Sequence, residues 1–168
     1  MKERDARLET PRLVLRPIRA RDVERCVEIV RAGGEFADRD HAAEFREEVE
    51  HWERHGFGPW VAEERESAEI VGTIDVNYAG PGLEGIEPDE VEVGWMLHPA
   101  ARGRGLATEG ARAACEDAFV RAATNELVAY VQPRNVASLR VADKLGMTDE
   151  GGGRSRDGEP VRIFRLRR

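Results

Sequence analysis

The sequence predicts an α/β protein of the α+β type: a single domain over residues 1–168, with a mixed, mainly antiparallel sheet of about six to seven strands flanked by helices. Short apolar or alternating segments bounded by Gly, Pro and Asp recur along the chain and are typical of strands. Between them lie segments whose apolar residues follow the helical spacing i, i+3, i+4, i+7. No internal repeat or long linker divides the 168 residues, and one domain of this length buries roughly two thirds of its unfolded surface.

The N-terminal half predicts a strand, two helices and a strand pair. The first strand covers residues 13–18, and Asp22 is placed as the cap of the helix that follows. The inward positions of that helix are Val23, Cys26, Val27 and Val30. The second helix has one apolar face, formed by Ala42, Phe45, Val49 and Trp52. After a break at residues 56–59, two antiparallel strands are predicted over 60–62 and 70–78.

The C-terminal half predicts alternating strands and helices and a closing hairpin. A Gly- and Pro-containing loop covers residues 79–89, and Thr108 caps or opens a helix with an inner face of small residues. Gly146 ends the last helix in the C′ position. Strands are expected at residues 90–97 and 127–131, the last helix at residues 137–145 and the closing hairpin at residues 151–166.

Composition excludes several classes of protein. A net charge of −7 argues against nucleic-acid binding, because that affinity comes from neutralising phosphates, and it is compatible with a cationic amine as substrate. No apolar run approaches the ~20 residues of a membrane span, and residues 1–5 open no signal peptide, so a cytoplasmic protein without membrane contact is expected. Cys26 and Cys115 form no CxxC pair and are expected as small, half-buried apolar residues.

The segment Val93–Glu109 is the most informative for function. It is typical of a short strand, a Pro turn, a loop of alternating Arg and Gly, and the start of an Ala-rich helix. Such a loop turns backbone N–H groups toward one point, and the helix start adds unpaired donors and its positive dipole end. With Arg102 and Arg104 it predicts a phosphate or pyrophosphate site, although neither a P-loop nor a dinucleotide fingerprint is present. The alternative is an Arg-Gly turn that caps an ordinary helix.

A second segment, Asn135–Met147, follows a predicted strand and ends in Leu-Gly-Met. Together with Arg102–Ala107 it makes the chain resemble the GNAT superfamily of acetyl-CoA-dependent N-acetyltransferases. The family patterns are Arg/Gln-x-x-Gly-x-Gly/Ala and Asn-x-x-Ser-x5-Lys-Leu-Gly-Phe, with Met147 here in the aromatic place. Thr10–Pro17, followed by Asp22, resembles the opening of the branch that acetylates the N-terminal alanine or serine of ribosomal proteins.

The resemblance implies a cofactor site for acetyl-CoA as co-substrate, without a metal. In the family the two central strands splay apart and the pantetheine arm lies in the gap. Backbone groups of Trp95, Met96 and Leu97 are then expected to pair with the arm, and Asn135 to contact it or cap its helix. The pyrophosphate is assigned to the loop residues Arg102, Gly103, Arg104, Gly105, Leu106 and Ala107.

Two residues are the candidates for proton chemistry. Glu92 is the predicted base, since the resemblance places a frequent family base in this region; Asp75 is the reserve, and a solvated acidic edge is the alternative for Glu90 and Glu92. The resemblance assigns Ser138 as hydrogen-bond donor to the cofactor sulfur, the alternative being an ordinary first-turn helix residue. Further candidates, whose side-chain directions the sequence does not fix, are Tyr78 and Tyr130.

The sequence leaves the acceptor open between a peptide or protein N-terminal amine and a small-molecule amine. Met96 stands where the branch usually has an aromatic residue that helps wall the acceptor site. The chemistry expected is direct attack of the amine on the thioester in a ternary complex; the alternative is a catalytically silent acyl-CoA-binding regulatory module. A monomer or a homodimer is expected. His98 is expected in a structural or solvent-facing role, and His51 and His55 lack further ligands for a metal.

Overall fold

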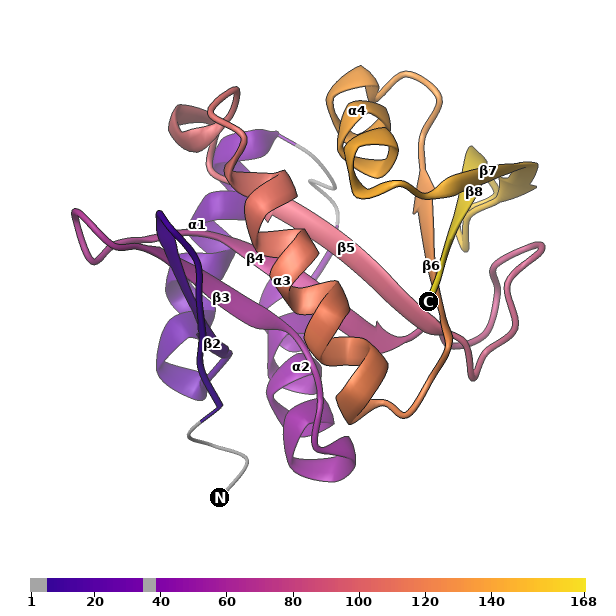
Figure 1. The fold of residues 1–168 in the computed structure, drawn as a ribbon. Helices are drawn as coiled ribbons and strands as arrows, with labels where there is room; N and C mark the ends of the chain where they lie inside the picture. The colour runs from indigo at the N-terminus through magenta and orange to yellow at the C-terminus, as the bar shows by residue number, and fades with distance from the viewer. Residues whose placement is uncertain (1–5, 35–38) are drawn as a thin grey trace.

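A computed structural model of the chain describes residues 6–34 and 39–168. Within them, eight strands form one sheet in the order β1-β2-β3-β4-β5-β6-β8-β7 (Figure 1). The α/β prediction is confirmed, with a strand count slightly above the expected six to seven. The additional strand is β1, whose two residues, Leu8–Glu9, are too few to carry an alternating pattern. The opening residues 1–5, for which no signal peptide is expected, lie outside the described residues.

The elements follow the predicted order with boundaries shifted by a few residues. In the N-terminal half they are β2 (Leu13–Pro17), α1 (Val23–Gly33), α2 (His41–His55), β3 (Trp60–Glu64), β4 (Ile70–Tyr78) and β5 (Val91–Leu97). In the C-terminal half they are α3 (Leu106–Arg121), β6 (Glu126–Val131), α4 (Val136–Leu145), β7 (Thr148–Arg154) and β8 (Pro160–Arg167). None of these helices is both long and apolar enough to span a membrane.

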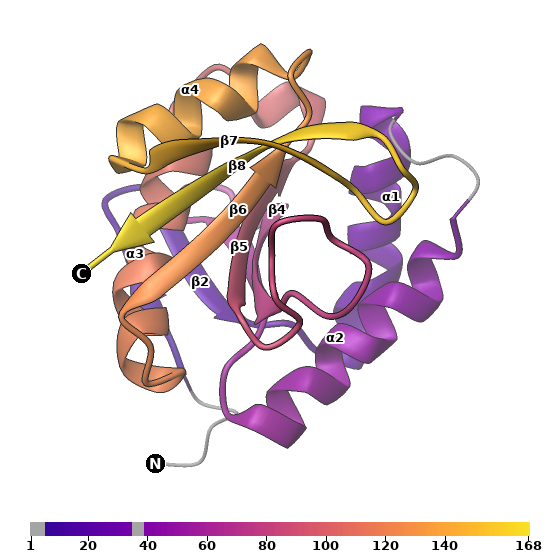
Figure 2. The ribbon, with the colours of Figure 1, turned by 90° about the vertical axis from the view of Figure 1, so that its right-hand side faces the viewer.

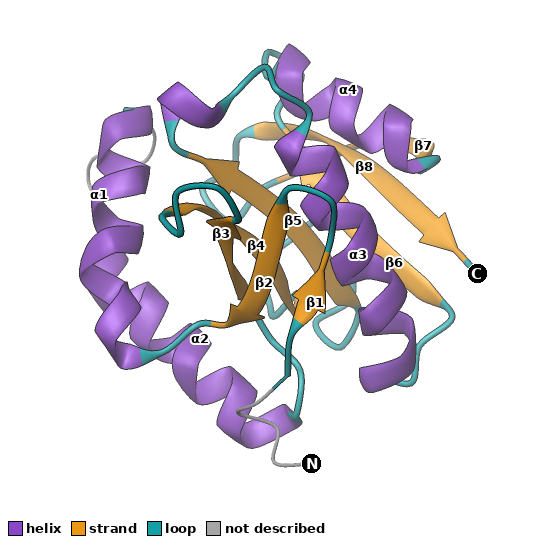
Figure 3. Cartoon of the chain, turned by 60° about the vertical axis from the view of Figure 1, so that its left-hand side comes forward, coloured by secondary structure: helices purple, strands orange, loops and turns teal. Residues whose placement is uncertain are grey.

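Helices cover both faces of the sheet. The pair α1 and α2 lies on one face, and α3 and α4 lie on the other (Figure 3). Helix α3 approaches the strands closely because its inner face carries small residues: a Cβ added to Gly110 would lie 3.2 Å from Ile74 and 3.3 Å from Leu13. Cys26 and Cys115 are both free, and they are fully buried, deeper than the half-buried positions expected of them.

The central strands β5 and β6 splay apart. Strand β4 pairs with β5 along its length, from Gly72 opposite Leu97 to Tyr78 opposite Val91. In contrast, β5 and β6 are parallel and paired only at Glu92 opposite Val128. Beyond this point the two strands diverge toward α4 (Figure 1). The expectation of splayed central strands is confirmed, and the divergence leaves backbone groups of β5 without sheet partners.

Two helix starts differ from the sequence prediction. Helix α3 begins at Leu106, with Gly105 in the N-cap position at φ +80°, so Thr108 is the third helical residue and not the opening one. Asp22 precedes α1 as predicted, but its carboxylate gives α1 no capping hydrogen bond. It accepts instead from the Arg16 guanidinium and from the backbone N–H of Arg19. At α3 the left-handed glycine sets the start of the helix, and before α1 the Arg16 guanidinium and the Arg19 N–H occupy the carboxylate that was expected to cap it.

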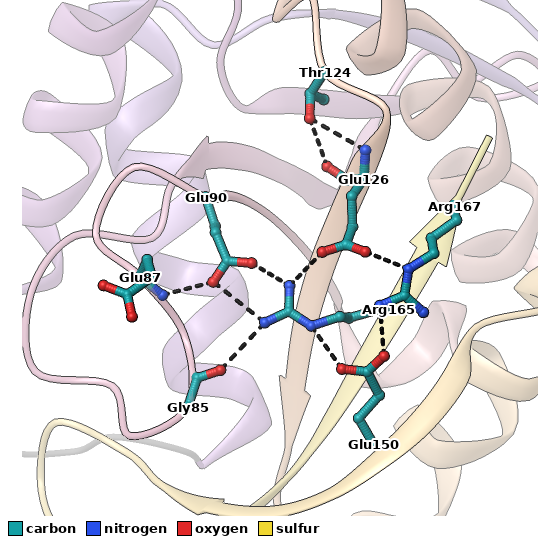
Figure 4. Close-up of polar contacts among 8 residues, drawn as sticks. All are labelled: Gly85, Glu87, Glu90, Thr124, Glu126, Glu150, Arg165 and Arg167. Atoms are coloured by element: carbon teal, nitrogen blue, oxygen red, sulfur yellow. Dashed lines mark hydrogen bonds and ion pairs between the residues drawn. The ribbon is translucent and has the colours of Figure 1, made fainter.

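Arg165 on β8 ties the C-terminal strands to the start of β5 (Figure 4). Its Nη1 contacts Glu90 and, at 2.7 Å, Glu126, while its Nε pairs with Glu150 at 2.8 Å. Burial alone would raise the pKa of Glu90, but hydrogen bonds from Arg165 and the backbone N–H of Glu87 outweigh it and lower that pKa. Glu90 is therefore a structural ion-pair partner, and the solvated acidic edge considered for it is not observed.

Candidate active site

A cavity of about 320 Å³ opens where β5 and β6 diverge, between the 102–107 loop and α4. Its size is within the range of small-molecule sites. Nine of the ten residues predicted to bind a cofactor lie on its walls: Trp95, Met96, Leu97, Arg102, Gly103, Gly105, Leu106, Ala107 and Asn135. Two stretches about thirty residues apart in the chain thus form one site.

The floor of the cavity is the loop before α3. Gly103 and Gly105 have φ of +75° and +80°, values that L side chains rarely adopt, so glycine is required for the turn itself. The N–H groups of the first turn of α3 have no partner four residues earlier in the helix and carry its positive dipole end. This geometry suits a phosphate or pyrophosphate group.

The two loop arginines differ in direction. Arg102 lies on the cavity wall, and its Nε donates to the Leu97 carbonyl at 3.0 Å. Arg104 differs from the expectation: its guanidinium forms an ion pair with Glu64 and is not part of the wall. Its carbonyl accepts from Arg12 at 2.7 Å, which fastens the loop to the turn before β2. Of the two arginines, Arg102 is the one on the cavity wall, and its guanidinium also lies against Gly33 of α1.

Ser138 lies on the α4 side of the cavity, held by two neighbours. Its backbone N–H donates to Asn135 Oδ1 at 3.1 Å, so Asn135 caps α4. Its hydroxyl oxygen accepts from Trp95 Nε1 at 3.3 Å. Because Trp95 occupies a lone pair of the hydroxyl, the hydroxyl hydrogen is left to point toward another acceptor in the cavity.

Glu92 lies on the opposite face of β5, at its pairing point with β6. Its cross-strand neighbour on β4 is Asn77, and Asp75, opposite Gly94, shares this face. Burial raises the pKa of Glu92 to about 7; the charge of Arg156 opposes this and that of Asp75 adds to it. Burial likewise raises the pKa of Asp75 to about 6, against a hydrogen bond from Thr73. Two carboxyl groups here titrate near neutral pH, as proton acceptors in active sites do.

Comparisons with known proteins identify the family of the chain. The family model of the acetyltransferase (GNAT) domain matches residues 12–148. The chain belongs to the GNAT acetyltransferase family. The probable N-acetyltransferase YjcK of Bacillus subtilis is 29% identical over 113 residues, which cover 67% of this chain and 59% of YjcK. The chain spans about half the length of the curated relatives it matches.

Solved structures share the GNAT fold over nearly the whole chain. The acetyltransferase from Agrobacterium tumefaciens superposes with a TM-score of 0.80 at 29% identity, over 97% of this chain and 95% of that one. RimL, a ribosomal L7/L12 alpha-N-protein acetyltransferase in complex with coenzyme A, has a TM-score of 0.76 at 17% identity, over 96% of this chain and 98% of its own. At that identity the likeness to RimL is one of fold.

Sequence reasoning missed five wall residues of this GNAT domain: Thr108, Ala137, Arg140, Val141 and Lys144. Arg140 and Lys144 are exposed on α4 and add cations to the wall opposite Arg102. The spacing 137, 140, 141, 144 is one helical stripe that continues from Ser138. That periodicity in α4 was the available signal for the cations.

Glu48 on α2 was also missed. Burial raises its pKa well above the usual range, and the charges of Asp75, Glu44 and Glu92 add to this. Within the described part of the chain, Glu48 Oε2, Asp75 Oδ1 and Asn77 Oδ1 are out of solvent contact and have no hydrogen-bond partner. Positions 41, 45, 48 and 52 form the inward stripe of α2, so the helical period does place Glu48 on the inner face.

The other residues singled out in the sequence are two tyrosines and three histidines, and they lie in different surroundings. The Tyr130 hydroxyl accepts from Arg156 Nη1 at 3.2 Å, near Glu92. Tyr78, at the end of β4, makes edge-on or tilted ring contacts with His51, His55 and Phe57. His98 has the expected structural role, since its Nδ1 accepts from the Ala100 N–H at 3.2 Å. His51 Nδ1 contacts the Phe57 carbonyl, and no group of metal-binding side chains occurs among the described residues.

Proposed function

We propose that the protein is an acetyl-CoA-dependent N-acetyltransferase that moves an acetyl group from the thioester to a primary amine by direct attack in a ternary complex. The observation that carries this is the position of the cavity. It opens at the split between β5 and β6, with Ser138 on one side of β5 and Glu92 on the other. The split lets a thioester from the α4 side meet an amine from the α2 side.

The residues present fit coenzyme A. The N–H groups of the 103–107 loop, with Arg102, hold the pyrophosphate. The backbone groups of Trp95 and the N–H of Leu97, which point away from β4, hold the pantetheine arm and polarise the thioester carbonyl. When bound, acetyl-CoA supplies the activated acetyl group. The wall carries no acidic side chain to oppose the phosphates: its ionisable members are Arg102, Arg140 and Lys144.

In this assignment Glu92 and Ser138 divide the proton chemistry. The amine nitrogen bonds to the acetyl carbon as the carbon–sulfur bond breaks. Glu92 accepts the proton of the amine, and the Ser138 hydroxyl donates a hydrogen bond to the departing sulfur. The acceptor is an amine of either class, a peptide or protein N-terminus or a small molecule. Met96, four residues after Glu92 on the same face of β5, is the residue expected to help wall the acceptor site. Cytoplasmic location and a monomer or homodimer belong to the same proposal.

Saturating acetyl-CoA should raise the melting temperature of the protein. At about 100 times its Kd a ligand adds about 2.7 kcal/mol to the free energy of unfolding, which corresponds to roughly 5–10 °C for a chain of this size. The measurement is thermal unfolding with and without acetyl-CoA, beside release of free thiol on a panel of amines. A shift with thiol release supports the transferase. No shift contradicts the assignment of the loop, and a shift without release from any amine favours the silent binding module.

Arg140→Gln and Lys144→Gln should each weaken acetyl-CoA binding. Both cations are exposed on the cavity wall, so each contact with a phosphate is worth up to about 1 kcal/mol, or roughly fivefold in Kd. The loss should shrink at high salt, because exposed charges are screened. Calorimetric titration at two salt concentrations measures this. Arg134→Gln is the matched control: Arg134 is exposed at the start of α4 but lies off the wall. Equal Kd values for the wild type and the three variants would contradict the placement of Arg140 and Lys144 beside the phosphates.

A further inference from the structure

One arginine in the turn between β7 and β8 joins three parts of the chain beside Glu92. Arg156 Nε donates to the Pro81 carbonyl at 3.2 Å, and its Nη2 donates to the Ala79 carbonyl. Its Nη1 donates to the Tyr130 hydroxyl at 3.2 Å. Nη2 also lies 3.9 Å from Glu92 Oε2. The guanidinium thus bridges the β4–β5 loop, strand β6 and the candidate base on β5.

The β4–β5 loop is shaped around this side chain. Gly80 and Gly82 have φ of +69° and +92°, and a Cβ added at Gly82 would lie 3.4 Å from Arg156 Cγ. The loop runs against the β7–β8 hairpin (Figure 2), where the Glu84 N–H donates to the Arg154 carbonyl at 3.0 Å. A Cβ at Gly153 would collide with the Glu84 carbonyl. Glycines on both segments therefore permit the close approach that places Arg156.

The groups that face Glu92 come from four elements. Asp75 on β4 and Glu48 on α2 add negative charge, and Tyr130 on β6 presents its hydroxyl. Glu44 acts on Glu48, and Arg39 acts on Tyr130, so both belong to the outer part of this set. Arg156 is the cation beside the Glu92 carboxyl itself. It lies beyond residues 12–148, the segment matched by the family model.

We propose that Arg156 is a positioning residue for acyl transfer, which fixes the 79–82 loop to the β7–β8 turn and keeps a positive charge beside the Glu92 carboxyl and the Tyr130 hydroxyl. The inference rests on the proposed role of Glu92. A nearby cation stabilises the ionised carboxylate, which is the form able to accept a proton from the amine. Without it, Glu92 stays protonated to higher pH in its buried, acidic surroundings. The 79–82 loop also loses the hydrogen bonds that the Arg156 guanidinium donates to its carbonyls.

Three variants separate the charge from the fork. Arg156→Gln removes the charge, and Arg156→Lys keeps it but cannot form the same fork of hydrogen bonds. Arg154→Gln is the control, because Arg154 is an exposed arginine of the same hairpin that contacts Glu84 and the Gly158 carbonyl but not Glu92. The two readouts are the pH dependence of kcat/KM with an amine that the wild type acetylates, and hydrogen exchange of residues 79–84 in the full chain.

The acid limb of the pH profile should move up by about one to three pH units in Arg156→Gln, the range for loss of a unit charge about 4 Å from a carboxyl between fully hydrated and part-buried surroundings. In Arg156→Lys the acid limb should return toward its wild-type position. In Arg154→Gln it should not differ from the wild type. Exchange of residues 79–84 should be faster in both Arg156 variants, and this readout needs no turnover. A wild-type acid limb in Arg156→Gln overturns the proposal, as does wild-type exchange in the loop. If no amine is acetylated by the wild type, the transferase assignment fails instead, while the exchange result still tests the fork.

Discussion

Glu92→Gln should lower kcat by on the order of 10²- to 10⁴-fold, the usual contribution of a positioned general base. The amide keeps the size of the side chain but cannot accept the proton of the amine. Binding of acetyl-CoA should be unchanged, because Glu92 lies off the cavity wall and on the face of β5 opposite Trp95. Steady-state kinetics measure kcat, and the thermal shift with acetyl-CoA measures retained binding. Glu84→Gln, on the exposed β4–β5 loop, is the matched control.

The role of Glu92 as base also predicts how kcat/KM depends on pH. Burial raises the pKa of Glu92 to about 7, and the base must be ionised to act, so wild-type kcat/KM should fall as the pH drops below about 7. The glutamine variant should lack this limb. Its stability at pH 8 should not fall. A carboxyl whose pKa is raised on folding favours the folded state at low pH and loses that contribution as the pH rises through its folded pKa. Glutamine removes the buried charge present at pH 8.

The size of the kinetic loss should depend on the acceptor. At pH 7 an α-amine with a pKa near 7.7–8.0 is about 15% neutral, whereas a lysine side chain is neutral at the order of 0.04%. The less neutral amine depends more on a protein base. The loss in Glu92→Gln should therefore be larger for lysine-like amines than for peptide N-termini. A wild-type kcat on every acceptor would remove Glu92 from the mechanism and leave a water relay or Asp75 as the base.

The elements were predictable because each carries a local signal. The helical spacing along α1 and α2 and the glycine at 146 with φ +79° are properties of a few neighbouring residues. The two-residue β1 carries no such pattern and is defined only by its pairing with β2. The splay of β5 from β6 came from the family resemblance, because no local pattern specifies where a parallel pair stops pairing.

The cavity side of the site was predictable for a similar reason. The 93–109 and 135–147 segments are contiguous motifs, and backbone geometry alone makes their glycines recognisable. The amine side is assembled from separate elements: Glu48 on α2, Asp75 on β4 and Arg156 in a late hairpin. Their proximity depends on how the elements pack. Arg104 is a further example. An arginine in this loop could bind a phosphate, but the guanidinium of Arg104 is held by Glu64 on β3, which is far away in the sequence.

Asp22→Ala should lower the free energy of unfolding by about 3–5 kcal/mol, the cost of breaking a buried ion pair. Asp22 is 3% exposed and accepts from Arg16 at 2.7 and 2.9 Å and from the Arg19 N–H at 2.9 Å. Alanine leaves the Arg16 guanidinium inside the protein with Glu63 as its remaining carboxylate. For a chain of this size the melting temperature should fall by about 10 °C. Chemical denaturation gives the free energy directly. Glu50→Ala, which breaks an exposed helix pair with Arg54, should cost no more than about 1 kcal/mol.

A double variant tests the cause of that loss. If the cost arises from a stranded guanidinium, Arg16→Met combined with Asp22→Ala should be more stable than Asp22→Ala alone, because an apolar side chain of similar length needs no counter-ion. If the cost arises from the lost turn before α1, where Asp22 accepts from the Arg19 N–H, the second substitution should restore nothing. The turn joins β2 to α1, and α1 and α2 lie on the face of the sheet where Glu48 acts on the candidate base. The cavity is lined by α4 and the start of α3, which lie on the other face. Asp22→Ala should therefore melt earlier yet keep its thermal shift with acetyl-CoA, which separates a structural ion pair from a residue of the site.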